Sequence, residues 1–207
     1  MGRVIKNIIL DIGDVLVRFM PEEAVNQVGV PKHKRQAVLD ATVGSVFWPE
    51  LDRGVMEESE VIDKMIMAAP DCSDEINRFF QYGKEWLVEE FEYTRPWIQT
   101  MKEAGLRVYL LSNYPKSYFE IHKQNQLSFV EMVDGMIISA CEGIVKPEEE
   151  IYKKLLNKYN LIPEECLFFD DRAVNVEGAK ACGICASVFT GIDDAIHTLH
   201  EHGICSI

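Results

Sequence analysis

Short apolar runs alternate with amphipathic segments along most of this chain, and this alternation is the feature that most restricts its fold. Apolar runs of this length, bounded by glycine or polar residues, are typical of strands that are buried on both faces of a sheet. We predict strands at Val4–Leu10, Leu106–Leu111, Asp134–Ser139, Cys166–Phe169 and Ile184–Phe189.

Between these runs, apolar residues recur at helical spacing. We predict helices at Pro96–Ala104, Lys116–Asn125, Pro147–Tyr159, Ala173–Cys182 and Asp193–His202. Regular alternation of strand and helix is the pattern of βαβ units, which build a parallel sheet with helices on both faces. The sequence therefore predicts an α/β fold with a doubly wound parallel-sheet core.

One long segment interrupts the alternation directly after the first strand. From about Pro21 to Thr94, apolar residues recur at helical spacing, with glycine and proline between the helical stretches. We predict that residues 18–94 form a helical cap inserted into the core. The core itself is then formed by residues 1–17 and 95–207.

The composition argues against several classes of partner. The 207 residues include 21 Lys plus Arg and 34 Asp plus Glu, and the net charge of -13 repels nucleic acid and anionic membranes. No apolar run approaches the roughly 18 residues of a membrane span. The apolar run near the N-terminus is too short for a signal peptide. We predict a cytoplasmic protein that acts on a small molecule; the sequence leaves its oligomeric state open.

Polar residues appear where the predicted strands end. In an open parallel sheet, ligands bind beyond the carboxyl ends of the strands, so these side chains should converge in one crevice. The positions are Asp11, Ser112-Asn113, Lys146 and Asp170-Asp171. The adjacent carboxylates repel each other unless a cation is present, and with Asp11 they offer the hard oxygen ligands that suit Mg²⁺. The alternative for the Asp170-Asp171 pair is a solvated helix N-cap.

Four motifs in this order resemble the haloacid dehalogenase-like hydrolase superfamily, over nearly the whole chain. They are ILDIGDVL, LLSN, VKPE and FFDDRAVNVEGA, and the stretch ELDRGVMEESEV is similar to the family's cap segment. The chain most resembles the phosphatases with a small helical cap, a group that includes sugar phosphatases and epoxide-hydrolase N-terminal domains. The resemblance implies a Rossmann-like core, a mobile cap and Mg²⁺ as cofactor.

The resemblance also gives the strand-end residues their expected roles. Asp11 should attack phosphorus and form an aspartyl-phosphate that water hydrolyses, which replaces one difficult displacement by two easier ones. Lys146 should offset the charge of the phosphate and of Asp11. Ser112 and Asn113 should contact the phosphoryl oxygens, although such a pair is also an ordinary helix N-cap. Asn175 is assigned a supporting role.

Gly13 departs from the commonest family pattern, in which an Asp at this position protonates the leaving oxygen and then activates water. The glycine carbonyl can still bind Mg²⁺, so the metal ligands would be Asp11, Gly13, Asp170 and Asp171. Losing a general acid and base typically costs about 10²- to 10⁴-fold in rate. Two explanations stay open: Asp14 substitutes, or the leaving group departs easily, as from an anomeric sugar phosphate or an acyl phosphate.

The cap is expected to select the substrate. Arg53 lies in a polar turn between helical stretches, where it is expected to contact a phosphate or a sugar hydroxyl, and a surface position is nearly as consistent with the sequence. Trp48, Trp86 and Trp97 offer a stacking wall for a sugar, but aromatic residues at helical spacing more often belong to the core.

Three functions are consistent with the sequence. The first is a Mg²⁺-dependent phosphomonoester hydrolase that acts on a small phosphorylated metabolite. The second is a carbon–halogen hydrolase on the same scaffold, which needs no metal and is therefore disfavoured by Asp170 and Asp171. The third is a non-catalytic binding or regulatory domain, which the presence of Asp11, Lys146 and both late aspartates disfavours.

Overall fold

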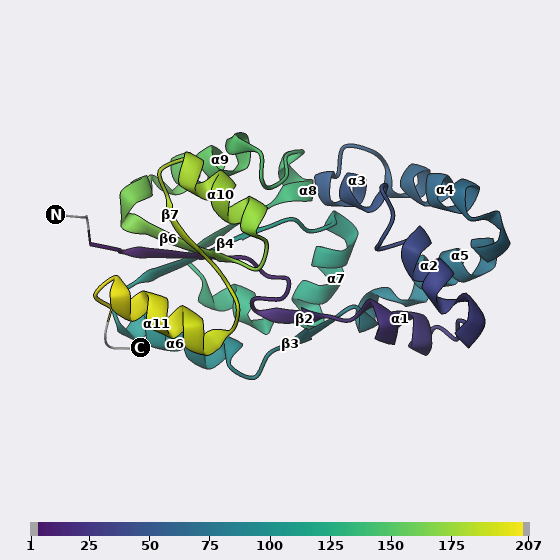
Figure 1. Cartoon of the computed structure of the whole chain (residues 1–207), viewed down its shortest axis with the longest axis horizontal. Helices are drawn as coiled ribbons and strands as arrows, with labels where there is room; N and C mark the ends of the chain where they lie inside the picture. Colours follow the sequence, from purple (N-terminus) through teal and green to yellow (C-terminus); the bar gives the residue numbers. More distant parts are fainter. Residues whose placement is uncertain (1–3, 205–207) are drawn as a thin grey trace.

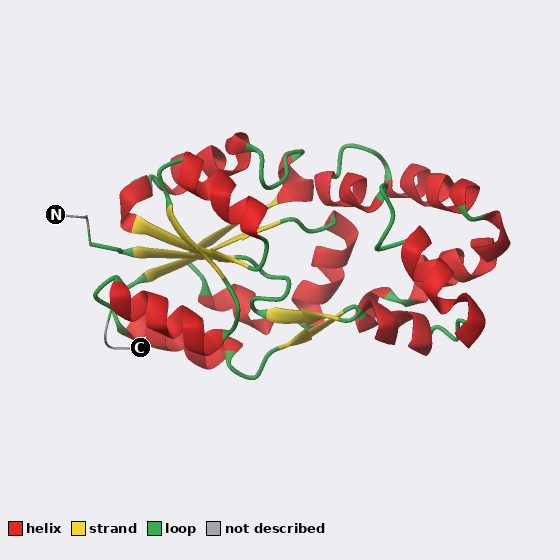
Figure 2. Ribbon diagram, viewed as in Figure 1, coloured by secondary structure: helices red, strands yellow, loops and turns green. Residues whose placement is uncertain are grey.

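A parallel sheet forms the centre of the molecule in the computed structural model, which describes residues 4–204. Its five strands lie in the order β5-β4-β1-β6-β7 (Figures 1 and 2). Their bounds are β1 Asn7–Leu10, β4 Arg107–Ser112, β5 Gly135–Ile138, β6 Cys166–Asp170 and β7 Cys185–Val188. The predicted α/β fold with a parallel, Rossmann-like sheet is confirmed.

Two apolar layers cover the two faces of the sheet, because successive strand residues point to opposite sides. In β1, Ile9 packs in the layer on one face, and Ile8 and Leu10 pack in the layer on the other. Helices α9 and α10 cover one face, and α6 and α11 cover the other (Figure 1). The helices of this part are α6 Thr94–Glu103, α7 Lys116–Asn125, α8 Ser139–Glu142, α9 Glu149–Tyr159, α10 Ala173–Ala181 and α11 Ile192–Glu201.

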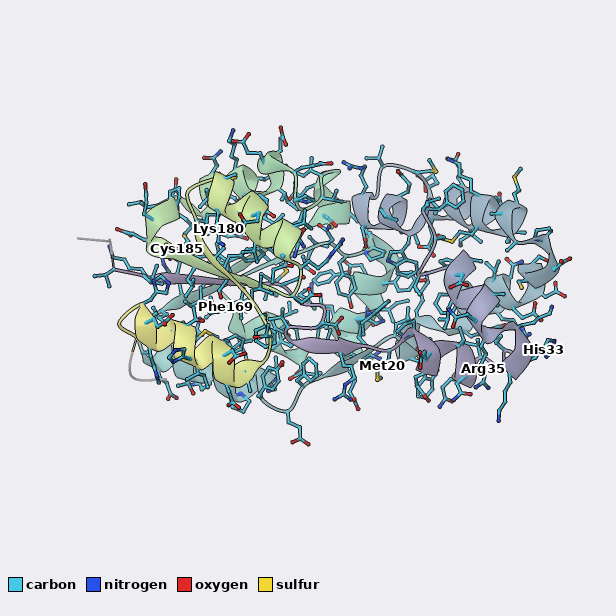
Figure 3. All side chains as sticks on the ribbon, in the orientation of Figure 1. Met20, His33, Arg35, Phe169, Lys180 and Cys185 are labelled. Carbon is cyan, nitrogen blue, oxygen red and sulfur yellow. The ribbon has the colours of Figure 1, made fainter. Side chains whose placement is uncertain are left out.

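The predicted helical insertion lies at one end of the molecule, beyond the carboxyl ends of the strands (Figure 1). It contains α1 Pro21–Gln27, α2 Arg35–Ala41, α3 Trp48–Arg53, α4 Glu58–Ala68 and α5 Ser73–Tyr82. In Figure 3, Met20 marks the entry to these helices, and Phe169 marks the sheet core. Short 3-10 turns lie between elements of the chain: η1 Lys32–Lys34 and η2 Pro70–Cys72 join helices, and η3 Lys84–Trp86, η4 Ser128–Met132 and η5 Pro163–Glu165 each precede a strand.

A small antiparallel ribbon connects the sheet to the insertion, and the sequence did not predict it. Strand β2 (Val17–Phe19) pairs with β3 (Val88–Glu90), with Val17 opposite Glu90 and Phe19 opposite Val88. The helical pattern predicted for residues 18–94 does not include this segment, because α5 ends at Tyr82 and β3 follows at Val88. Strand β3 forms because its backbone N–H and C=O groups pair with those of β2. The Met20 N–H extends this pairing by donating to the Leu87 carbonyl at 2.7 Å.

The tryptophans and the cysteines differ in their exposure. Trp97 is buried in the core, whereas Trp86 is exposed. The cysteines at 72, 141, 166, 182 and 185 are free thiols, and Cys205 lies outside the described residues. No helix within residues 4–204 has the length and apolar character needed to cross a membrane. The cytoplasmic location stays a prediction.

The buried His122 of α7 makes two side-chain hydrogen bonds, one of which reaches the insertion side of the molecule. Its Nε2 donates to the Lys84 carbonyl at 2.6 Å, so Nδ1 accepts from the Tyr114 hydroxyl, also at 2.6 Å. Burial lowers the pKa of His122, which keeps the imidazole neutral and suits this donor and acceptor pair.

Replacing His122 by Leu should therefore lower the free energy of unfolding by about 2–5 kcal/mol, because each buried polar group left unpaired costs about 1–3 kcal/mol. Urea denaturation followed by circular dichroism measures this loss. The matched control is His197→Leu in α11, since His197 is exposed and a surface change of this kind costs less than about 0.5 kcal/mol. Equal losses in the two variants would contradict the assigned role of His122.

Candidate active site

Asp11 directly follows β1 and is buried at the carboxyl edge of the sheet. Its N–H donates to the Phe169 carbonyl at 3.0 Å, which continues the pairing between β1 and β6. Asp11 Oδ1 accepts a hydrogen bond from Ile12 N–H at 2.7 Å and lies 2.9 Å from Lys146 Nζ. These contacts fix the orientation of the carboxylate. Burial raises the pKa of Asp11 to about 7, although the charge of Lys146 lowers it.

Lys146 is the buried cation of the site. Its Nζ lies 2.6 Å from Asp170 Oδ2 and donates to the Leu111 carbonyl at 2.8 Å, in addition to its contact with Asp11. Asn113 holds the lysine backbone: Oδ1 accepts from Lys146 N–H at 2.8 Å, and Nδ2 donates to the Lys146 carbonyl at 3.0 Å. Burial lowers the pKa of Lys146, but the charges of Asp11 and Asp170 outweigh burial and raise it. The lysine therefore stays protonated.

Asp170 is the last residue of β6 and the second carboxylate that pairs with Lys146. Its Oδ1 accepts from Arg172 N–H at 2.9 Å, and Asn175 Nδ2 lies 2.9 and 3.1 Å from its two carboxylate oxygens. The Ser112 hydroxyl at the end of β4 lies against Asp11 and lowers the pKa of that carboxyl. Every one of these side chains comes from the carboxyl end of a strand or from the segment after it.

The carboxylates fit a divalent cation. Asp11, Asp170 and Asp171 each place one oxygen within 4.8 Å of the others. Burial, followed by the charge of Asp170, raises the pKa of Asp171, and one lysine cannot balance three carboxylates. Hard oxygen ligands of this kind suit Mg²⁺. In addition, Asn175 lines the same cavity, and its Oδ1 is buried without a hydrogen-bond partner among the described residues.

A cavity of about 200 Å³ lies above these residues, between the sheet edge and the helical insertion. Its floor is charged and contains Asp11, Lys146 and Asp171, with Gly13 beside them. The rest of its lining is mainly apolar and includes Phe19, Trp48, Leu87, Val88, Pro115 and Tyr118. The Trp48 and Tyr118 rings meet edge to face at 5.7 Å between centroids. The Tyr118 hydroxyl is buried with no hydrogen-bond partner among residues 4–204.

The structure brings most of the predicted site residues together, but not all. Arg53 does not line the cavity: its guanidinium binds Glu148 through contacts of 2.5 and 3.1 Å and lies 3.4 Å from the Gly143 carbonyl. In this structure Arg53 therefore joins the insertion to the core, and its contact with a substrate phosphate or hydroxyl stays a prediction.

Asp14 lines the edge of the cavity but its carboxylate is engaged elsewhere. Its Oδ1 accepts from Phe19 N–H at 3.1 Å, which stabilises the turn that leads into β2. Asp14 itself has a φ of 52°, a left-handed conformation that Asp tolerates better than most residues.

Asp52 was missed by sequence reasoning, although it directly precedes Arg53. It belongs to α3, yet it lines the cavity together with Asp11. Burial and then the charge of Asp11 raise the pKa of Asp52 to about 7. No residue type or spacing distinguished Asp52 from the other acidic residues of the insertion, so the sequence held no signal for this placement.

Comparison with known proteins decides the family. A sequence model of the haloacid dehalogenase-like hydrolases matches residues 5–183. The chain belongs to this family of hydrolases.

Two curated relatives and one solved structure are similar to this haloacid dehalogenase-like hydrolase. A sesquiterpene phosphatase of Aspergillus oryzae, astK, is 26% identical over 185 residues, which cover 89% of each chain. A phosphorylated carbohydrates phosphatase of Thermotoga maritima is 25% identical over 147 residues, covering 71% of this chain and 63% of that protein. A HAD family enzyme of Bacteroides thetaiotaomicron, in complex with magnesium and inorganic phosphate, matches with a TM-score of 0.73 and 23% identity over 94% of this chain and 98% of that one.

Proposed function

We propose that this hydrolase is a Mg²⁺-dependent phosphomonoester hydrolase with Asp11 as its nucleophile. The observation that carries the proposal is the charged sheet edge below the cavity, where Asp11 lies beside the buried Lys146 and forms a cluster of three carboxylates with Asp170 and Asp171. The names of the two curated relatives and the magnesium and phosphate in the similar structure support the same activity.

The proposed reaction uses the charged side chains at the sheet edge, where Lys146 lies between Asp11 and Asp170. A carboxylate oxygen of Asp11 attacks phosphorus, the bond from phosphorus to the leaving oxygen breaks, and water then hydrolyses the aspartyl-phosphate. Lys146 holds Asp11 in place and offsets negative charge beside it. Bound at Asp11, Asp170, Asp171 and the Gly13 carbonyl, Mg²⁺ would supply the positive charge that balances the phosphoryl oxygens.

The lining of the cavity supports a small phosphomonoester whose leaving group has an apolar face as the substrate. Phe19, Trp48 and Tyr118 provide aromatic contact surface, and the unpartnered Tyr118 hydroxyl offers a hydrogen bond. An anomeric sugar phosphate meets this description when a C–H face of the ring contacts the aromatic residues. Residues 18–94 then act as a cap that selects this leaving group.

Chelation of metal with EDTA should abolish phosphate release, and added Mg²⁺ should restore it, because the carboxylate cluster lacks balancing positive charge without the ion. The measurement is phosphate release from a panel of sugar, acyl, aryl, prenyl and nucleotide monophosphates, with and without Mg²⁺. The ranking of these compounds tests the apolar character of the cavity.

The same panel, extended by a 2-haloacid, separates the alternatives. Release of halide from a 2-haloacid in EDTA, with no phosphate release from any compound, would favour carbon–halogen hydrolysis on Asp11. No turnover of either substrate class, with intact folding, would favour a binding or regulatory role.

A further inference from the structure

Asp52 reaches the cavity from the helical insertion, and residues of the core hold it there. The Asp52 carbonyl accepts a hydrogen bond from Ser139 Oγ at 2.5 Å, and the neighbouring Arg53 is paired with Glu148. Gly54 follows with a φ of 67° and lies so close to α8 that a Cβ atom there would be 2.5 Å from the Ala140 carbonyl oxygen. Three successive residues at the end of α3 are thus fitted to the core.

The carboxyl of Asp52 faces the catalytic charges. Asp11, Lys146 and Arg172 are the charged groups close enough to act on it. Among the described residues, no cation forms an ion pair with Asp52, and its side chain makes no hydrogen bond. Because burial and the charge of Asp11 both disfavour a second anion here, the carboxyl retains a proton to a higher pH than an ordinary aspartate.

Within residues 4–204, the core offers no free carboxyl group beside Asp11 other than those of the charged floor. Gly13 has no side chain, and a Cβ atom built there meets nothing within 4 Å, so the space next to the nucleophile is open. Asp14 is exposed and its carboxylate is hydrogen-bonded to Phe19 N–H. Of the carboxyl groups that line the cavity, Asp11 and Asp171 belong to the charged floor, which leaves Asp52.

We propose that Asp52, carried by the insertion, is the general acid and base of the reaction. This inference rests on the proposed phosphatase activity. As Asp11 bonds to phosphorus, the Asp52 carboxylic acid gives its proton to the departing oxygen and an alcohol leaves. The Asp52 carboxylate then removes a proton from water, whose oxygen bonds to phosphorus while the bond from phosphorus to Asp11 breaks. Inorganic phosphate leaves, and both aspartates return to their starting states.

A leaving-group series tests the role of Asp52 in the intact protein. We expect kcat/KM of Asp52→Asn to fall about 10²- to 10⁴-fold for alkyl phosphates, whose leaving oxygen needs a proton. For nitrophenyl phosphate, whose leaving group departs as an anion, kcat/KM should change little. The variant should then release one nitrophenol per site in a burst, because hydrolysis of the aspartyl-phosphate has lost its base. Glu50→Gln in the same helix is the matched control, since Glu50 does not line the cavity.

A second variant separates chemistry from placement of the insertion. Gly13→Asp introduced into Asp52→Asn should restore turnover of alkyl phosphates, because a side chain at residue 13 has room beside Asp11. A loss in Asp52→Asn that is equal for all leaving groups, or that Gly13→Asp leaves unchanged, would overturn the proposal and assign Asp52 to substrate binding or to positioning. Failure of the phosphatase proposal looks different, because the protein with Asp52 intact would then release no phosphate.

Discussion

Phosphate release by Asp11→Asn should fall by at least about 10⁴-fold, because loss of an enzyme nucleophile removes the covalent route entirely. An amide oxygen in place of the carboxylate is a poor nucleophile, and no aspartyl-phosphate can form. The burst of leaving group expected for Asp52→Asn should be absent here. Rapid-quench kinetics with nitrophenyl phosphate measure both quantities.

The same substitution should leave the fold intact and make it more stable in the absence of metal. Asparagine has nearly the shape of aspartate, so it still accepts the hydrogen bonds from Ile12 N–H and Lys146 Nζ. Because burial raises the pKa of Asp11 to about 7, ionisation of this carboxyl opposes folding above the pKa of the unfolded chain. Asp11→Asn should have a higher unfolding midpoint than the unmodified protein in EDTA at pH 8, and it should lack phosphatase activity when Mg²⁺ is present. Retained phosphatase activity would remove Asp11 as the nucleophile.

The convergence of the site residues could be predicted from the sequence because it depends only on strand order along the chain and on parallel pairing. Leu10 is opposite Leu110 in β4 and opposite Phe169 in β6. The residues that follow these three positions therefore lie next to one another at the same edge of the sheet, which places Asp170 beside Asp11. The contacts of Lys146 could not be predicted from its position after β5. They depend on the two hydrogen bonds by which Asn113 fixes the Lys146 backbone.

The ribbon between β2 and β3 could not be predicted, because each strand is short and its partner is distant in the sequence. Val88–Glu90 continues an apolar spacing that indicates a helix when it is read alone. Strand formation depends on Val17–Phe19, on the far side of the whole insertion. Tertiary pairing of this kind overrides local propensity.

The neighbours Asp52 and Arg53 show why sequence identifies a functional segment better than a functional side chain. Successive residues of a helix project about 100° apart, so one residue can face the cavity while the next faces the core. The family resemblance implied that this turn reaches the crevice, and Arg53 was the side chain expected to contact the substrate. In the structure Arg53 pairs with Glu148, and Asp52 is the side chain that lines the cavity.

Replacing Lys146 by Met should cause the other large loss, in activity and in stability together. Lys146 Nζ lies between Asp11 and Asp170 and also binds the Leu111 carbonyl. Removing one partner of a buried ion pair costs about 3–5 kcal/mol, because the remaining charge has no compensation. We expect a decrease of that size in the free energy of unfolding in EDTA, and a loss of phosphate release of about 10²- to 10³-fold, the range found when one donor to developing charge is removed.

The stability of Lys146→Met with and without Mg²⁺ shows whether the variant has lost a charge or lost packing. If Lys146 acts by its charge, Mg²⁺ bound at the carboxylate cluster should recover stability in Lys146→Met, since any ligand that binds only the folded state stabilises it. Lys153→Met is the matched control, because Lys153 is exposed on α9 and pairs with Glu149 of the same helix. If Lys146→Met were as stable as this control in EDTA, Lys146 would not be the cation that holds Asp11 and Asp170 together.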